Sequence, residues 1–342
     1  MIRPEQINLY CDNGYLNTGE LLKLPFTFIW VIGGRGTGKT YGFLRDIITS
    51  GQEFMLLRRT ATQIQLLQTP EFSPFGKLNA DFGWDLVPRS ISKEISGIYH
   101  AEEAGAPIGF MAPLSTFANT RGFNADTLDI ILFDEFIKEK QERYMKGEAF
   151  AFLNAYETMN RNRELEGRPP IRAVFCSNSV ELDNPLFVEL GFVTLFERMK
   201  REGREIQFAP KFDSVFINLE HSPISEAKRT TALYRLAHRS SFAEMSLDNS
   251  FSIDYAAYQS LPLIEYKPLV SVGEITVYRH KSNGSYYCTP HYSGSPPRYG
   301  TSEAELKRFK SAWAMQLSSA YLARKIIFET YYTEALLTRF LK

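Results

Sequence analysis

The sequence predicts an α/β fold in which helices cover both faces of a mainly parallel sheet and a smaller α+β module follows. Three observations support this class. Short apolar runs alternate with stretches of helical character through roughly the first 200 residues, as in parallel strands joined by helices. The first run leads directly into a glycine-rich segment ending in Gly38-Lys39-Thr40. The chain of 342 residues, 44% hydrophobic and 23% charged, is long enough for two domains with sizeable cores.

The expected elements of the sheet follow in a regular order. Apolar runs predict buried strands at residues 26–32, 53–58, 108–114, 128–133 and 171–177. Helical patterns occupy residues 41–50, 60–67 and 149–163. Parallel strands bring their carboxyl ends to one edge of the sheet, where ligands bind. We therefore expect four residues to gather at that edge, namely Gly33, Arg58, Asp134 and Ser177.

The pattern changes at about residue 193, where charged helical sequence replaces the alternation. The basic and aromatic mixture from Lys228 to Arg239 is compatible with a DNA path and equally with a solvated helix face. Beyond residue 261, strand-like runs flank Ser282-Asn283-Gly284, a strong hairpin signal, and residues 303–342 predict one or two amphipathic helices. We expect three parts: a domain with a phosphate-binding loop at 1–200, a helical linker at 201–250 and an α+β domain at 251–342.

The segment Gly33-Gly34-Arg35-Gly36-Thr37-Gly38-Lys39-Thr40 has the spacing of a phosphate-binding loop, or P-loop. Glycines let backbone N–H groups turn inward around a polyphosphate, and the following helix adds a favourable dipole. Lys39 is expected to reach the β- and γ-phosphates, and Thr40 to place its hydroxyl on Mg²⁺. The role of Arg35 stays open, and the alternative for the whole segment is a glycine-rich turn with an unrelated lysine. The motif predicts a nucleoside triphosphate and Mg²⁺ as ligands.

Two adjacent acids supply the second half of the expected site. The apolar run at 128–133 delivers Asp134 beside the loop, where it can hold Mg²⁺ through the water shell of the ion. Glu135 is then the natural residue to orient and polarise the attacking water. The alternative is a helix N-cap. Ser177 and Asn178 end the following strand and are candidates to sense the γ-phosphate, with a locally hydrogen-bonded turn as the alternative.

Four arginines are candidates to take part in nucleotide hydrolysis. Arg161 and Arg163 are candidates for an arginine finger that reaches the nucleotide of a neighbouring subunit and stabilises the transition state. A solvated helix face is the alternative for both. Arg58 and Arg59 could contact phosphate or couple nucleotide state to motion, or they could form ordinary salt bridges at a strand end.

Composition excludes several classes. The formal net charge is zero, which argues against tight, static coating of nucleic acid by the whole surface. Nothing approaches the 18 consecutive apolar residues of a membrane span, and the N-terminus lacks the apolar core of a secretory signal. Three isolated cysteines fit a reducing compartment and provide neither a disulfide framework nor a zinc site.

The motifs together resemble a known family. The loop at 33–40, the run 54–59 ending in two arginines, the run 130–136 with its acid pair, and Ser177-Asn178-Ser179 followed by 184–187 come in a distinctive order. In this order they are similar to the genome-packaging ATPases of small, phi-twenty-nine-like short-tailed phages, relatives of the large terminase subunit. The likeness covers about the first 200 residues and continues weakly to the end.

The resemblance implies an ASCE-type P-loop ATPase that forms a homo-oligomeric ring, expected to be a pentamer. The ring would dock on the portal of an empty procapsid in the host cell cytoplasm and drive double-stranded DNA inward with ATP. By position, Lys39 and Thr40 bind phosphate and Mg²⁺, Asp134 holds the metal, Glu135 is the catalytic glutamate, and Arg161 or Arg163 is the finger. Whether a scaffold RNA or a capsid protein completes docking stays open.

One departure from the terminases concerns the C-terminal part. Large terminases carry an RNase H-like nuclease whose aspartates bind two metals, and this chain has no aspartate after Asp254. We therefore expect a domain that is RNase H-like in fold and inactive as a nuclease. A terminase with an active nuclease and a nucleotide-gated scaffold without catalysis are the competing hypotheses. The first conflicts with the missing aspartates and the second with an intact Glu135. A kinase or a solute-transporter ATPase fits less well.

Overall fold

The chain folds into two units in the computed structural model. One unit comprises Met1–Glu181 and Glu202–Phe251, and the other comprises Leu182–Arg201 and Ser252–Lys342. The structure describes residues 3–102, 105–117, 123, 125–138, 142–178, 182, 184–237 and 258–341. Within these ranges, no helix is long and apolar enough to cross a bilayer.

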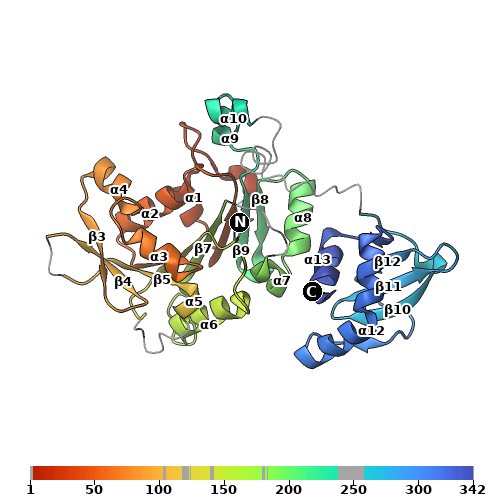
Figure 1. The fold of residues 1–342 in the computed structure, drawn as a ribbon. Coiled ribbons are helices and arrows are strands. Elements are labelled where there is room, and N and C mark those ends of the chain that lie inside the picture. Colours follow the sequence, from red (N-terminus) through yellow and green to blue (C-terminus); the bar gives the residue numbers. More distant parts are fainter. Residues whose placement is uncertain are drawn as a thin grey trace. The chain divides into compact units, whose positions relative to one another are not determined.

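A nine-stranded sheet forms the centre of the first unit, in the order β3-β4-β5-β2-β6-β7-β1-β9-β8 (Figure 1). The six strands from β5 to β9 in this order are mutually parallel, and antiparallel strands flank them at both edges. The parallel strands are β1 (Phe28–Ile32), β2 (Phe54–Arg58), β5 (Gly109–Pro113), β6 (Ile130–Asp134), β7 (Arg172–Ser177) and β9 (Ser214–Asn218). The antiparallel ones are β3 (Leu86–Ser90), β4 (Ser96–His100) and β8 (Ile206–Ala209). All five strands predicted from the apolar runs are confirmed.

Helices cover both faces of this sheet, as expected. One face packs against α1 (Thr18–Leu22), α2 (Lys39–Thr49) and α4 (Phe75–Phe82) through a core of aliphatic and phenylalanine side chains, and α3 (Ala61–Leu67) adds Ile64 to it. The other face packs against α6 (Glu148–Asn160), and α5 (Leu114–Phe117) contacts α6 there (Figure 1). Aromatic rings dominate that side. Trp30 stacks on Phe175 with 3.7 Å between the ring centroids, and Phe133 stacks on Phe152 with 5.5 Å between them. Because both faces are covered, the central strands are continuous apolar runs, with polar or charged residues confined to their ends.

The prediction of a helical linker at 201–250 is wrong for residues 206–218. Residues 206–218 form β8 and β9, and β9 pairs with β1 in the main sheet. Two short helices follow, α9 (Pro223–Lys228) and α10 (Ala232–Leu236). Preceding this stretch, α7 (Pro185–Leu190) and α8 (Val193–Arg201) belong to the second unit, although we expected the first domain to extend to residue 200. Arg239 and Ser179 lie outside the described residues.

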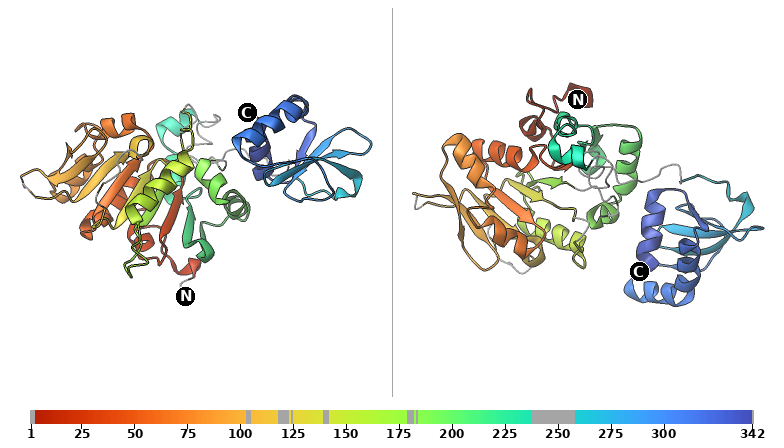
Figure 2. Two further views of the ribbon diagram at one scale, coloured as in Figure 1. Left: turned by 90° about the horizontal axis from the view of Figure 1, so that it is seen from below. Right: turned by 45° about the horizontal axis from the view of Figure 1, so that its top comes forward.

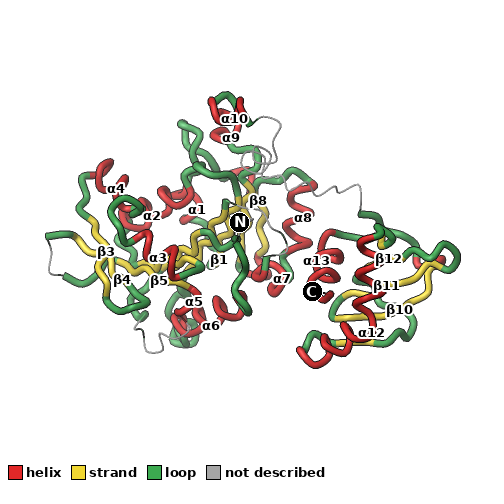
Figure 3. The backbone as a smooth tube through the Cα atoms, in the orientation of Figure 1, coloured by secondary structure: helices red, strands yellow, loops and turns green. Residues whose placement is uncertain are grey.

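The second unit is an α+β structure with a five-stranded sheet in the order β13-β10-β11-β12-β14 (Figures 2 and 3). Its strands are β10 (Tyr266–Val272), β11 (Ile275–His280), β12 (Tyr286–Thr289), β13 (Arg298–Tyr299) and β14 (Ile326–Phe328). The hairpin predicted around Asn283-Gly284 joins β11 to β12. Two helices, α12 (Glu303–Leu322) and α13 (Tyr331–Leu341), share one apolar core with the sheet. The module predicted after residue 251 is therefore present, with β14 between the two helices.

Candidate nucleotide site

The glycine-rich loop begins at the end of β1 and leads into α2. The Gly33 N–H donates to the Ser177 carbonyl at 3.1 Å, which ties the loop to the end of the neighbouring strand β7. A Cβ at Gly33 would collide with the Leu219 side chain, so only glycine fits there. Gly38 has φ +90 and caps the start of α2 in a conformation that other residues adopt at a cost. The loop thus has the strand–loop–helix context that the motif requires.

Lys39 is the first residue of α2 and is buried under the loop. Its ammonium donates to the Gly33 and Gly34 carbonyls at 2.8 Å each and to the Thr37 hydroxyl at 3.2 Å. Burial lowers the pKa of Lys39 to about 8, and the opposite charge of Asp134 counteracts this only in part. A polyphosphate bound by the loop would supply further negative charge and favour the ammonium form. The geometry therefore suits an anion beside Lys39.

Asp134 comes from β6, two strands away from β1, and meets Thr40 directly. The Thr40 hydroxyl donates to Asp134 Oδ2 at 2.8 Å. Burial raises the pKa of the Asp134 carboxyl, and its interaction with Arg58 opposes that rise. A hydroxyl and a carboxylate oxygen are hard donors that suit Mg²⁺, which keeps several waters and takes few protein ligands beside phosphates. These two residues fit the expected metal.

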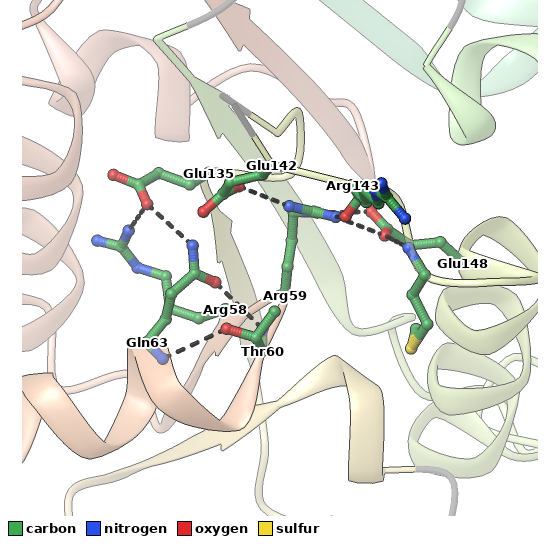
Figure 4. A network of polar contacts seen from close by, with 9 residues as sticks. Arg58, Arg59, Thr60, Gln63, Glu135, Glu142, Arg143 and Glu148 are labelled. Atoms are coloured by element: carbon green, nitrogen blue, oxygen red, sulfur yellow. Dashed lines mark hydrogen bonds and ion pairs between the residues drawn. The ribbon is translucent and has the colours of Figure 1, made fainter. Parts of the chain in front are cut away.

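Glu135 follows β6 with φ +58, in the left-handed region that few residues other than glycine adopt. Its carboxylate forms an ion pair with Arg58 Nη1 and accepts from Gln63 Nε2 at 3.5 Å (Figure 4). Arg58 Nη2 also donates to Asp134 Oδ2 at 2.7 Å, so one guanidinium joins both acids. Burial opposes a charged Arg58, but the two carboxylates outweigh it and raise its pKa. All four strand ends predicted to meet, those of β1, β2, β6 and β7, are adjacent in the sheet.

Comparison with known proteins identifies the family. The model of the podovirus DNA encapsidation protein (Gp16) matches residues 12–261, which is more than half of the chain. The chain belongs to this family. DNA packaging proteins of Bacillus phages PZA and phi29 are each 27% identical to it over 243 residues, or 69% of this chain. The match spans 66% of the length of these relatives.

Solved packaging motors share the fold of this chain. The Phi-29 viral genome packaging motor assembly matches with a TM-score of 0.65 and 21% identity, over 96% of this chain and 99% of that chain. The Phi-28 gp11 DNA packaging motor matches with a TM-score of 0.64 and 20% identity, over 96% and 98%. Both matches extend over nearly the whole chain, so the likeness in fold includes both units.

A second arginine network lies beside the acids. Arg59 is 2% exposed and donates through Nε and Nη2 to the two carboxylate oxygens of Glu148, at 2.8 and 2.9 Å (Figure 4). It also donates to Glu142 at 2.8 Å and to the Arg143 carbonyl at 2.9 Å. Since Glu148 starts α6, Arg59 fastens the end of β2 to the segment that connects Glu135 with α6. The salt-bridge alternative for Arg58 and Arg59 is therefore the observed arrangement.

The structure does not bring Arg161 and Arg163 to the acids. The helix predicted to reach residue 163 ends at Asn160, and Arg161 follows with φ +47. Arg163 is 6% exposed and donates to the Ala125 and Asp126 carbonyls at 2.9 and 2.8 Å, ahead of β6. Both arginines thus lie at the amino-terminal edge of the parallel strands, opposite the P-loop. The side chain of Arg161 is 48% exposed.

Other predicted residues lie where expected. Ser177 is buried at the end of β7, and Asn178 follows it, half-buried. The sequence analysis did not identify Gln63, and it assigned Lys228 to a DNA path or a solvated helix face rather than to the loop. Gln63 could have been found through the capping box of Thr60 and Gln63, which holds its amide at the start of α3. Lys228 lies against the loop without any local signal, because 193 residues separate it from Arg35.

Proposed function

We propose that this chain is an ATPase that drives double-stranded viral DNA into a procapsid. The observation that carries the proposal is the convergence of Lys39, Thr40, Asp134 and Glu135 at the carboxyl edge of one sheet. Family membership, and relatives named DNA packaging proteins, support DNA as the cargo. A glycine-rich turn with an unrelated lysine would not place both acids beside that lysine.

Each residue has a distinct task in hydrolysis. The loop N–H groups and Lys39 would bind the β- and γ-phosphates, and Thr40 and Asp134 would hold Mg²⁺, which would supply positive charge against the phosphates. Glu135 orients and polarises the water that attacks the terminal phosphorus. The phosphorus–oxygen bond to the β-phosphate then breaks, leaving ADP and phosphate. Arg58 must release Glu135 before that carboxylate can act on water, because an ion-paired carboxylate is a weaker base.

We assign the trans-acting finger to Arg161 rather than Arg163. A finger must extend from the surface toward a neighbouring subunit. Arg163 is buried and already bound to two carbonyls, so its contribution is to the local fold. Arg161 is half-exposed, and with the described residues its side chain makes only long contacts, at 3.7 Å to Asp126 and 3.5 Å to the Phe123 carbonyl. Little stabilisation of its own chain would therefore be lost when Arg161 binds the nucleotide of a neighbouring subunit.

The proposed partners follow from the relatives. The matched structures are a viral genome packaging motor assembly and a DNA packaging motor. We infer a homo-oligomeric ring, a pentamer by resemblance, on the portal of the procapsid in the host cytoplasm.

For the second unit we propose an RNase H-like module that does not cut DNA. No group of three metal-ligating side chains occurs among the described residues. Two of its glutamates accept hydrogen bonds from tyrosines, Glu334 from Tyr258 and Tyr321 and Glu274 from Tyr332. We expect no cleavage of supercoiled plasmid by the full chain with Mn²⁺. Nicking that a chelator abolishes would favour the terminase with an active nuclease.

The central test separates nucleotide binding from turnover. We expect Lys39→Ala to abolish ATP binding, whereas Glu135→Gln keeps binding and lowers turnover at least about 100-fold, as for loss of a general base. Lys23→Ala is the control, since Lys23 is an exposed lysine paired with Glu20. Phosphate release and equilibrium binding are measured with double-stranded DNA and portal complex present. A near-normal rate for Glu135→Gln would refute the assignment of the base.

A further inference from the structure

A lysine from a distant segment lies against the P-loop. The Leu219 N–H donates to the Ile32 carbonyl at 2.8 Å, so the chain after β9 runs beside the start of the loop. It then forms α9, whose last residue is Lys228. The Lys228 ammonium donates to the Arg35 carbonyl, and a Cβ at Gly36 would collide with that same ammonium. Lys228 therefore touches the middle of the loop.

Two ammonium groups consequently face one loop. Lys39 binds the carbonyls of residues 33 and 34, and Lys228 binds the next one. Burial lowers the pKa of Lys228, and the charge of Lys228 adds to the effect of burial in lowering the pKa of Lys39. Among the residues that the structure describes, Lys228 has no ion pair with a carboxylate. Two neighbouring cations without an intervening anion repel each other, and a bound anion would remove that cost.

The position of Lys228 indicates which part of a nucleotide it would meet. The motif places the Lys39 ammonium at the β- and γ-phosphates, and Lys228 binds the loop carbonyl that directly follows the two that Lys39 binds. Glu135 serves the terminal phosphate, where water attacks. Lys228 therefore approaches the end of the site where hydrolysis takes place, and its flexible stem lets the ammonium leave the Arg35 carbonyl for a phosphate oxygen.

We propose that Lys228 binds the terminal phosphate of the nucleoside triphosphate held by the loop, and so distinguishes ATP from ADP. This inference rests on the proposed ATPase function. Release of the terminal phosphate would remove the ligand of Lys228. The segment from β9 through α10 would then have one contact that depends on the nucleotide state.

The test compares two nucleotides in calorimetric titrations with Mg²⁺. We expect Lys228→Ala to weaken ATPγS binding roughly tenfold, as for one charge-assisted hydrogen bond, and ADP binding less than about twofold. Lys228→Met keeps the apolar stem and should reproduce this selective loss. Lys228→Arg keeps the charge and should retain most of the preference for ATPγS over ADP. Arg229→Ala is the matched control, because this adjacent cation pairs with Glu226 at 2.8 Å.

The outcomes separate this inference from the proposed function. If the unaltered chain does not bind ATPγS, the ATPase proposal itself fails. If it binds, and Lys228→Ala and Lys228→Met bind both nucleotides as the unaltered chain does, the inference alone is refuted. An equal loss for ATPγS and ADP would also refute it, since Lys228 would then only support the loop.

Discussion

Arg58 joins the two acids of the site through a single guanidinium. Its side chain is 11% exposed, and Asp134 beside it is 4% exposed, so water screens their attraction weakly. The ion pair occupies carboxylate oxygens that would otherwise serve a metal and a water. The arginine thus neutralises Asp134 and Glu135 and holds Glu135 away from its proposed role.

Removal of Arg58 should make the fold depend on a divalent cation. Arg58→Ala leaves two neighbouring carboxylates without their shared cation, at a cost on the order of 3 kcal/mol for a broken buried pair. We expect a clearly lower melting temperature in EDTA, and a larger rise with Mg²⁺ than in the unaltered chain because the ion replaces the lost charge. Arg58→Lys keeps the charge, so its rise in melting temperature with Mg²⁺ should lie between those of Arg58→Ala and the unaltered chain. Equal Mg²⁺ shifts in all three proteins would contradict this account.

The sequence could predict the residues of the site whose signals are local. The spacing of Gly33, Lys39 and Thr40 and the position of Asp134 after an apolar run are each contained in a few residues. The partners of Arg58 could not be predicted in the same way, because 76 residues separate it from Asp134. Arg59 and Glu148 are 89 residues apart. Such contacts depend on strand order, which a single sequence does not contain.

Dependence on strand pairing also explains why the sequence analysis missed the strand at 214–218. The central strands are apolar runs between a loop motif and helical stretches, so their type follows from the pattern. The segment 214–218 is also buried, but it lies in charged surroundings that suggested a helical linker. Its strand character depends on pairing with β1, with Phe28 opposite Ser214 and Ile32 opposite Asn218. Periodicity alone could not assign so short a run.

Helix α8 carries a buried acid with a testable effect on stability. Glu197 is 5% exposed, its Oε1 accepts from the Tyr331 N–H at 3.3 Å, and its Oε2 has no hydrogen-bond partner among the described residues. Burial raises the pKa of this carboxyl, against the opposing effects of that N–H and of Arg201. The folded state therefore favours the protonated form of Glu197 more than the unfolded chain does. Its stability should fall as pH rises through the raised folded-state pKa, since the unfolded chain ionises more readily.

Glu197→Gln should remove this penalty while keeping an acceptor for Tyr331. We expect a melting temperature a few degrees higher than that of the unaltered chain at pH 7.5, for a gain on the order of 1 kcal/mol. The difference should shrink as the pH falls below about 4, where the glutamate of the unfolded chain also becomes protonated. Scanning calorimetry over this range measures it, with the exposed Glu189→Gln on α7 as control. A lower melting temperature at neutral pH would show that the charge stabilises the fold.

The position of Arg161 has a consequence for the whole assembly. Within one chain this arginine lies at the edge of the sheet opposite Lys39 and Glu135, so it cannot complete its own site. It can act only if a ring brings it to the next subunit, where it would stabilise the charge of the transition state. Catalysis would then require two neighbouring subunits, each contributing a different residue.

Mixed rings test this directly. Arg161→Ala and Glu135→Gln should each abolish DNA-stimulated hydrolysis alone. Equal mixing should restore it at interfaces that pair an intact Glu135 with the intact Arg161 of a neighbour, roughly a quarter of them in randomly assembled rings. Mixing Arg161→Ala with the double variant Arg161→Ala/Glu135→Gln is the control, since no interface then has an intact finger. If the first mixture is no more active than this control, Arg161 does not act in trans.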